Sequence, residues 1–597
     1  MAPQKPLPHL RKTVRSSQLI VDGEPFLMLA GELHNSTFSN AQYASEIWPS
    51  MKARNINTLL GPVTWELIEP TEGEFNFTEL DQIILDARKH GFRLVLLWFG
   101  MYKNALSSYA PQWVRCDPER FPRICIRDAA GELKVTEAIQ PYGVEAQQAD
   151  AKAFAQLMRH LKEFDGVDNT VIMVQVENEI GIMWDARDRS TTAEKLIRGE
   201  APMRLLKHLQ SSWDDLHPYF RAKFPDFQHL NTASEPLSWT EAFGDGEWRD
   251  DIFMADAFSR FVHTVAAAGR AEYDIPLYVN VALCSEDSSW VDFGEIPAGV
   301  PEGERPGQFP SGGPVGHSLD IYVHNAPDIQ FYAPDIYLQR YESVAKCFAH
   351  KHMPLFIPEQ RRDGYGVRRI WPALAEYLAI GCSPFGIDSL PLEECHLPLH
   401  YGLLSKARKF ILDAQANRPD DLFGFYFDNA GESDDSKQSW VKVLGEFEIT
   451  VERAFVFGKP VEAAGMIIRQ VDGTYLLLGY GYQATFKSTS STSCFSGILM
   501  AEEMDTDEQG NLLKIRTLNG DETSHHKLIT MPSQKPDYDG FPIPFLVPAR
   551  TMIASCRPYS LEQSVCEIGK ATFTSTSIFW LGYPGFNYNK ERVSNTS

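Results

Sequence analysis

Cysteine is scarce in this 597-residue chain, which has nine cysteines, no CxxC pair and no spacing typical of zinc ligands. Secreted proteins use cysteines in even sets that form disulfides, so this pattern predicts free thiols in a reducing compartment. The first fifteen residues contain proline, lysine and arginine but no apolar stretch of the kind found in a secretory signal. No apolar run approaches the ~18 residues that cross a bilayer. We therefore expect a cytoplasmic protein without a membrane-spanning segment.

Positive charge is also in short supply. Lysine and arginine number 56 against 79 aspartates and glutamates, a formal net charge of −23. So acidic a chain is poorly suited to the phosphates of nucleic acid or to an anionic membrane surface, and we expect neither partner. The GxSxG, Walker A, GxGxxG and HExxH motifs are absent as well. The sequence therefore predicts no metal and no cofactor.

Short apolar stretches alternate with helix-periodic segments over the first ~415 residues. Each stretch has four to eight residues rich in Val, Ile, Leu, Phe or Tyr and ends at polar residues or at Gly or Pro, as strands do. The expected strands are 26–32, 58–65, 94–100, 171–177, 277–283, 329–335, 355–358 and 383–388. The expected helices are 41–54, 80–90, 145–164, 254–273, 338–350, 371–380 and 403–416. Eight strands alternating with helices predict an α/β fold, a (β/α)8 TIM barrel over residues 1–415.

The composition and periodicity of the sequence change after residue 416. Helical periodicity fades, and Thr, Ser, Gly, Val and Tyr dominate stretches such as 473–482, 484–496, 512–518 and 571–581. We expect residues 416–597 to form one or two β-sandwich or jelly-roll-like accessory domains. Within the barrel, the segments 184–251 and 285–320 are longer than a minimal connection needs. They are either functional loops or packing insertions.

Glutamates follow two expected strands that face each other across the barrel mouth. The fourth strand runs into Glu177-Asn178-Glu179, and the seventh runs into Pro358-Glu359. Catalytic groups of such barrels project from the carboxyl ends of the strands. Cleavage of a glycosidic bond with retention needs one carboxylic acid to protonate the leaving oxygen and one carboxylate to attack, ~5–5.5 Å apart. The two strand ends can supply that pair.

The segments 174–181 (VQVENEIG), 65–77 (WELIEPTEGEFNF) and 356–360 (FIPEQ) resemble the retaining glycosidases with paired glutamates on barrel strands four and seven. Among these the chain looks most like glycoside hydrolase family 35, the β-galactosidase family. The segments 98–113 and 309–320 resemble a subgroup with a C-terminal β-domain. The resemblance implies that Glu179 is the acid/base, that Glu359 is the nucleophile and that Asn178 binds the 2-hydroxyl of the reacting sugar.

Five further residues are candidate substrate contacts, some of them with a structural alternative. Trp65 and Glu66, at the end of the second strand, could line the pocket, with barrel packing as the alternative for Trp65. Lys103 and Asn104 follow the third strand, where a sugar-binding loop belongs, or lie in a solvated loop. Tyr337 follows the sixth strand, from which it could hydrogen-bond the nucleophile.

Four more residues carry weaker predictions. His317 is a sixth candidate substrate contact, although a satisfied polar role is the alternative. Glu177 should point the same way as Glu179 if the strand stays regular, because side chains two residues apart share a face. Trp290 and Trp371 either stack on sugar faces or belong to the core.

These observations predict a retaining, exo-acting β-glycosidase. The favoured activity is that of a β-galactosidase, which removes terminal non-reducing β-D-galactosyl residues from a β-linked oligosaccharide or glycoside by double displacement. A β-glucosidase or a transglycosylase with the same two glutamates is the first alternative. A carbohydrate-binding pseudoenzyme is the second. The sequence leaves both a monomer and a homo-oligomer open.

Overall fold

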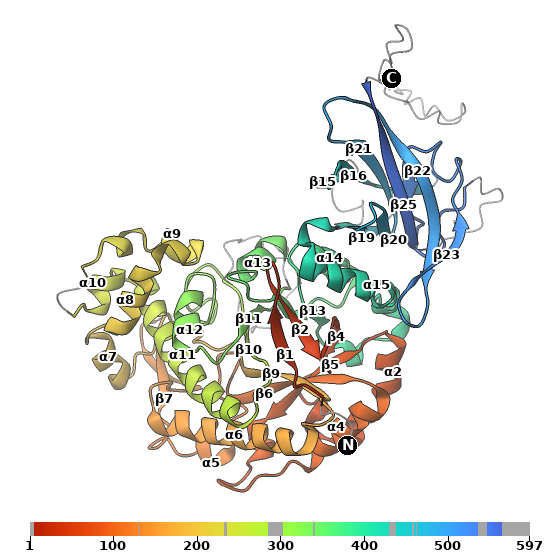
Figure 1. Cartoon of the computed structure of the whole chain (residues 1–597). Helices are drawn as coiled ribbons and strands as arrows, with labels where there is room; N and C mark the ends of the chain where they lie inside the picture. The colour runs from red at the N-terminus through yellow and green to blue at the C-terminus, as the bar shows by residue number, and fades with distance from the viewer. Residues whose placement is uncertain are drawn as a thin grey trace, which may run out of the picture.

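Eight parallel strands form the barrel that the sequence predicts (Figure 1). The computed structural model describes residues 5–128, 130–231, 236–284, 303–337, 341–428, 438–456, 459–460, 462–534 and 546–563. In chain order the barrel strands are β4 (Met28–Glu32), β5 (Thr58–Thr64), β6 (Arg93–Lys103), β9 (Val171–Asn178), β10 (Leu277–Val281), β11 (Phe331–Pro334), β12 (Phe356–Gln360) and β13 (Gly381–Pro384). Each overlaps one of the expected ranges, which confirms the fold class for this part of the chain.

The ring closes between its sixth and seventh strands. The ladder runs β11-β10-β9-β6-β5-β4-β13-β12. A parallel bridge joins Ile336 to Gln360, and the Ile336 N–H donates to the Glu359 carbonyl at 2.8 Å. Closure buries both faces of every strand, which explains why the strands are near-continuous apolar runs rather than alternating ones.

An N-terminal sheet, which the sequence pattern did not predict, covers one end of the barrel. It consists of β1 (His9–Lys12), β2 (Ser17–Val21) and β3 (Glu24–Pro25). Leu19 and Val21 of β2 belong to the same buried apolar cluster as Ala30, Leu60 and Phe356 of the barrel interior. Because β2 packs against the barrel interior, the carboxyl ends of the strands are left as the open mouth where a site can form.

The helices around the barrel agree with the predicted pattern in order but differ in bounds: the helices expected to begin at residues 254, 371 and 403 begin at 247, 364 and 397. They are α1 (Ala41–Ala44), α2 (Trp48–Ala53), α4 (Thr78–His90), α6 (Val144–Asp165), α11 (Glu247–Glu272), α13 (Tyr341–Phe348), α14 (Gly364–Ala375) and α15 (Leu397–Asn417). The predicted helix 41–54 is broken in two. Helix α14 begins seven residues before the predicted start, because the Asp363 side chain caps it by accepting from the Gly366 N–H at 3.0 Å.

The connections carry more structure than was predicted. A hairpin of β7 (Arg123–Arg127) and β8 (Leu133–Ile139) lies between β6 and α6. The insertion at 184–251 folds into α7 (Thr191–Ile197), α8 (Met203–Ser211), α9 (Pro218–Lys223) and α10 (Trp239–Phe243), which pack beside α11 and α12 (Leu319–Asn325) at one side of the barrel (Figure 1). Residues 285–302 of the other long insertion, including Trp290, lie outside the described residues.

Three antiparallel sheets follow α15: a pair of strands, β17 (Phe455–Val456) and β18 (Lys459–Pro460), and two larger sheets that stand to one side of the barrel (Figure 1). The larger contains β14 (Leu422–Phe427), β19 (Ala463–Arg469), β20 (Tyr475–Tyr480), β25 (Ile553–Glu562), β22 (Ser493–Thr506) and β23 (Leu512–Thr517). The smaller contains β15 (Ser439–Leu444), β16 (Phe447–Arg453), β21 (Tyr482–Ser488) and β24 (Leu528–Thr530). Phe425 and Leu477 of the first sheet share one apolar cluster with Ile449 and Phe486 of the second. The expected strand at 571–581 lies outside the described residues.

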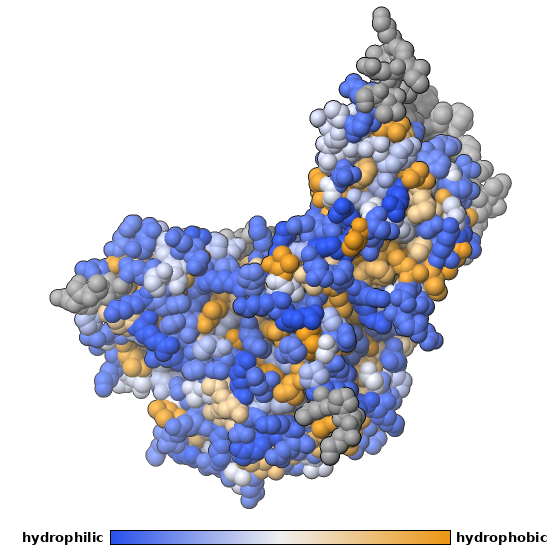
Figure 2. Space-filling model, viewed as in Figure 1, coloured by the Kyte–Doolittle hydropathy of each residue, from blue (hydrophilic) through white to orange (hydrophobic). Residues whose placement is uncertain are grey.

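Hydrophilic residues dominate the molecular face shown in Figure 2. Within the described residues, none of the helices has the length and hydropathy of a membrane span. Seven described cysteines are free, whereas Cys494 forms a disulfide. The prediction that all cysteines are free thiols was therefore wrong for Cys494, since spacing along the chain does not reveal which distant strands meet. Cysteine usage consequently does not support the expected reducing compartment.

Candidate active site

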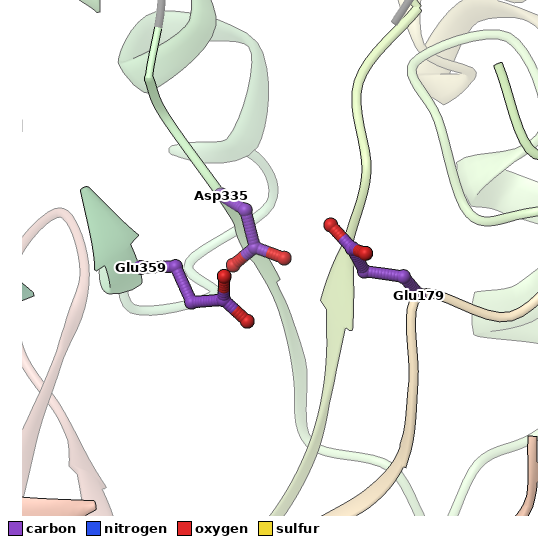
Figure 3. A group of neighbouring side chains, drawn as sticks. All are labelled: Glu179, Asp335 and Glu359. Atoms are coloured by element: carbon purple, nitrogen blue, oxygen red, sulfur yellow. The ribbon is translucent and has the colours of Figure 1, made fainter. Parts of the chain in front are cut away.

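Three carboxylates converge at the barrel mouth. Glu179 follows β9, Asp335 follows β11 and Glu359 lies near the end of β12, and the three side chains point toward one another (Figure 3). Each offers an oxygen that lies within 4.8 Å of an oxygen from each of the others. Glu179 is 8% exposed, Glu359 7% and Asp335 1%. The structure thus brings together the two glutamates predicted from the sequence and adds a third acid.

Asn280 of β10 organises this group. Its side-chain N–H2 donates to Asp335 Oδ2 at 2.8 Å and to Glu359 Oε1 at 3.3 Å. Its side-chain oxygen accepts from the Glu179 backbone N–H at 3.0 Å. A single fully buried amide therefore contacts all three acidic residues and fixes their spacing.

The proton-binding behaviour of Glu179 follows from this crowding. Burial and, second, the charge of Glu359 raise the pKa of Glu179 to about 7. Burial and the charges of Glu359 and Glu179 raise the pKa of Asp335 well above its usual range. Since like charges this close disfavour joint ionisation, Glu179 can hold a proton near neutral pH. A carboxyl with that property is suited to general acid catalysis.

Lys103 and Asn178 lie beside the carboxylates, as predicted. The Lys103 ammonium donates to Asn178 Oδ1 at 2.8 Å and lies 4.6 Å from the centre of the Phe99 ring. The Asn178 amide nitrogen is 3.5 Å from Glu359 Oε1. Tyr337 is also in the group, because its hydroxyl donates to Glu359 Oε2 at 2.7 Å. Glu359 is therefore held from two sides.

Trp65 and Glu66 have partners of their own. Trp65 is fully buried, and its indole N–H donates to Glu69 Oε2 at 2.8 Å. Glu66 forms an ion pair with Arg115 at 3.3 Å. The described contacts of both residues are structural, and none of them involves the three carboxylates.

The described contacts of Asn104 and His317 likewise do not involve the three carboxylates. Asn104 is exposed in a left-handed conformation (φ 51°), and its backbone N–H donates to the Asn178 carbonyl at 3.1 Å. The His317 ring lies 2.5 Å from the buried Asp251 carboxylate and packs edge-on against Trp248. The described contacts of His317 support the satisfied polar role rather than a sugar contact.

Glu177 does not point toward Glu179. Both residues have positive φ angles, 60° and 45°, so the end of β9 is not a regular strand. Glu177 Oε2 instead accepts from the Tyr102 backbone N–H at 2.6 Å, outside the barrel mouth. There it faces Asp150, and burial, followed by the charge of Asp150, raises the pKa of Glu177 well above its usual range. These acids hold the end of β6, which carries Lys103.

The sequence reasoning missed Asp335, Asn280 and Glu32. Asp335 ends an apolar strand as Glu359 does, and Asn280 is the one polar residue within 277–283, so both signals were readable. Glu32 ends β4, is 1% exposed and has no hydrogen-bond partner on either carboxylate oxygen among the described residues. Burial, then the charges of Glu359 and Glu179, raise its pKa well above the usual range, while Lys103 opposes them.

The three convergent carboxylates are also the group of described residues whose oxygens are close enough to share a metal ion. Oxygen ligands of this type suit Mg²⁺ or Ca²⁺. Cation binding would require Glu179 to be ionised, because a metal ligand must be deprotonated. It would therefore compete with the proton that Glu179 holds.

Two segments of the chain match models of known protein families. Residues 37–249 match the family model for glycoside hydrolase family 42, described as beta-galactosidase. Residues 397–530 match a family described only as a domain of unknown function. Residues 37–249 are therefore similar to a glycoside hydrolase domain of β-galactosidase type.

Individual relatives are distant. A beta-galactosidase of Xanthomonas manihotis is 28% identical over 28% of this chain and 26% of its own length. Beta-galactosidase 11 of Arabidopsis thaliana is 26% identical over 28% of this chain and 18% of its own length. The chain thus matches about a quarter or less of these relatives. Among solved structures, the beta-galactosidase of Rahnella sp. R3 aligns with a TM-score of 0.41 and 14% identity, covering 69% of this chain and 58% of that one.

Proposed function

We propose that the protein is a retaining, exo-acting β-glycosidase, most simply a β-galactosidase, with Glu179 as acid/base and Glu359 as nucleophile. The observation that carries the proposal is the pair of buried glutamates from opposite sides of the barrel mouth. Their oxygens lie within 4.8 Å, and the pKa of Glu179 is raised to about 7. So close an approach favours direct attack by a carboxylate over inversion, in which the carboxyl groups stand ~6.5–9.5 Å apart to admit a water.

The mechanism follows from the contacts of each group. A Glu359 oxygen attacks the anomeric carbon while the Glu179 proton passes to the departing glycosidic oxygen, which leaves a glycosyl ester on Glu359. Glu179, now ionised, takes a proton from water, and the resulting hydroxide equivalent attacks the same carbon and releases Glu359. Tyr337 and Asn280 hold the Glu359 carboxylate in place before and after each step.

Lys103 and Asn178 are proposed to bind hydroxyls of the terminal sugar. They offer an ammonium and an amide at the edge of the carboxylate group, and such directional donors discriminate epimers better than apolar surfaces do. Trp65, Glu66, Asn104 and His317 remain predicted contacts whose described partners are structural. The resemblance to family 35 and the family 42 match both favour galactose as that sugar.

The proposal is tested with purified protein and a panel of aryl glycosides: β-galactoside, β-glucoside, β-glucosaminide, β-xyloside and α-arabinoside. We expect the β-galactoside to be turned over fastest and proton NMR to show the β-anomer as the first product. A faster β-glucoside would support the first alternative, and accumulation of transfer products would support a transglycosylase. No turnover of any glycoside would contradict the enzyme assignment in favour of a binding protein.

The proposed domain arrangement assigns this chemistry to residues 1–415 and an accessory role to residues 416–597. Asp428, which follows β14, pairs with Arg368 and Arg369 of α14 at 2.8 and 2.7 Å. These buried arginines tie the first strand of the larger sheet to a barrel helix, which supports an accessory part that is fixed to the catalytic part rather than loosely linked.

A further inference from the structure

Trp184 is an exposed tryptophan in a strained backbone conformation. Its side chain belongs to the exposed large hydrophobic residues, with 62% of the residue accessible, and no other described tryptophan is in that class. Its φ angle is 70°. A left-handed conformation is rarely adopted by a bulky residue, and it persists only where the surrounding structure imposes it.

The neighbouring strand-five insertion imposes this conformation from one side. The Trp184 N–H donates to the Gly307 carbonyl at 2.7 Å, and Ile182 and Ser311 exchange two backbone hydrogen bonds of 2.9 and 2.8 Å. Gly307 itself has φ 90°, and a side chain there would come within 2.8 Å of the Asp185 backbone. Close backbone contact therefore fixes the residues just before and after Trp184.

A second set of contacts fixes the segment beyond Trp184. Asp185 accepts from the Arg189 guanidinium at 2.5 Å and from the Arg127 backbone N–H at 2.9 Å. The Ser311 hydroxyl donates to the Ala186 carbonyl at 2.6 Å. The backbone is thus held on both sides of an indole that is left largely uncovered. A ring carried on a fixed backbone is partly preorganised for a ligand, since the backbone loses little conformational freedom on binding.

Its place in the chain indicates which part of a substrate the ring could meet. Trp184 is five residues beyond Glu179, within ~19 Å even for a fully extended chain at 3.8 Å per residue. In the proposed mechanism, Glu179 is the group that protonates the leaving oxygen. Because Glu179 acts on the leaving-group side, the segment that continues from it is the part of the chain that starts on that side of the site.

We propose that Trp184 is a stacking platform for the leaving-group sugar of a β-linked oligosaccharide. This inference rests on the proposed glycosidase function. The apolar C–H face of a pyranose can cover the indole, which removes apolar surface of both partners from water. The residue would contribute to specificity for the sugar on the leaving side of the scissile bond and would take no part in the chemical step.

The test compares two substrates with the same terminal sugar, a β-galactosyl fluoride and a β-linked galactosyl disaccharide. Fluoride leaves without a ring, so it cannot use the platform. We expect Trp184→Ala to lower kcat/KM for the disaccharide by about tenfold or more and to change the value for the fluoride by less than about twofold. Trp184→Phe should recover part of the disaccharide value. Tyr43→Ala removes a comparably exposed ring (63% accessible) from α1 and should change neither.

A binding measurement supports the kinetic one. In the Glu359→Ala background, which cannot form the glycosyl ester, Trp184→Ala should weaken binding of the disaccharide by a similar factor and leave binding of the monosaccharide unchanged. Equal losses for both substrates, or no loss for the disaccharide, would overturn the inference. A wild-type protein that consumes neither substrate, nor the matching pair with glucose, would instead refute the proposed function.

Discussion

Replacement of Glu179 by glutamine is the sharpest test of the acid assignment, because the structure sets the size of the effect. An ordinary glutamic acid with pKa 4.5 would be about 0.3% protonated at pH 7, whereas a group with pKa about 7 is about half protonated. The site thus raises the protonated fraction roughly 150-fold. Glutamine keeps the shape of the side chain but can deliver no proton.

The loss should depend on the leaving group. General acid catalysis contributes about 10²–10⁴ in rate, so Glu179→Gln should lower kcat/KM for a disaccharide by about that factor. A dinitrophenyl glycoside, whose leaving group needs no proton, should lose less than about tenfold in the first step. The second step then becomes limiting because no base activates water. Added azide should restore turnover of Glu179→Ala and yield a glycosyl azide of retained configuration.

The pH dependence of kcat/KM should show whether Glu179 acts in its protonated form. The catalytically competent form has Glu179 protonated, so kcat/KM of the wild type should be lost as pH rises through about 7. In Glu179→Gln that alkaline limb should disappear for the dinitrophenyl substrate. A leaving-group plot with equal losses throughout, or an alkaline limb that survives the substitution, would refute the assignment of Glu179 as the acid.

Three further predictions concern other residues. Glu359→Ala should abolish turnover for every leaving group, and mass spectrometry after treatment with a 2-fluoro glycoside should place the label on Glu359; label on another carboxylate would contradict the nucleophile assignment. A buried carboxyl without a partner needs a polar ligand, so we expect Glu32 to bind a hydroxyl of the sugar. Glu32→Gln should then lower kcat/KM about 10- to 100-fold for the parent sugar and much less for the deoxy sugar that lacks this hydroxyl. Equal losses for the two sugars would indicate a structural role. His317→Ala should lower the free energy of unfolding by about 1–3 kcal/mol, measured by denaturant titration, because Asp251 loses a buried partner; a loss of kcat/KM without loss of stability would restore His317 as a sugar contact.

The barrel could be predicted from the sequence because its signals are local. Each strand is a short apolar run closed by polar or turn-forming residues, and local residues also end helices: the Asn40 side chain caps α1, and Gly91 with φ 77° ends α4. The sheet β1–β3 and the β7–β8 hairpin were missed because β1, β3 and most of β8 are exposed and lack such runs, and because the apolar part of the buried β2 is only three residues long, Leu19 to Val21. Helix α14 was predicted too short, because Gly364, Gly366 and Pro372 are poor helix formers that only the capping by Asp363 and the tertiary packing compensate.

The site could be predicted only where chemistry and strand ends coincide. Glu179 and Glu359 were found because each ends an apolar run at the carboxyl end of a barrel strand. The orientation of Glu177 could not be read in this way. A regular strand would place Glu177 beside Glu179, but the positive φ angles at both residues turn the chain. No local sequence pattern predicts these φ angles. They depend on contacts with the strand-three loop, which is distant in the sequence.

The crowding of acids at Asn280 links the two steps of the proposed mechanism. The charge of Glu359 is, after burial, the main cause that raises the pKa of Glu179. When Glu359 becomes a neutral ester, that repulsion is lost, and the pKa of Glu179 must fall. Glu179 is therefore an acid while the nucleophile is free and a base once the nucleophile is occupied, which is the order that the double displacement requires. The Asn280 amide donates to Asp335 as well as to Glu359, so one side chain holds both carboxyls beside the acid.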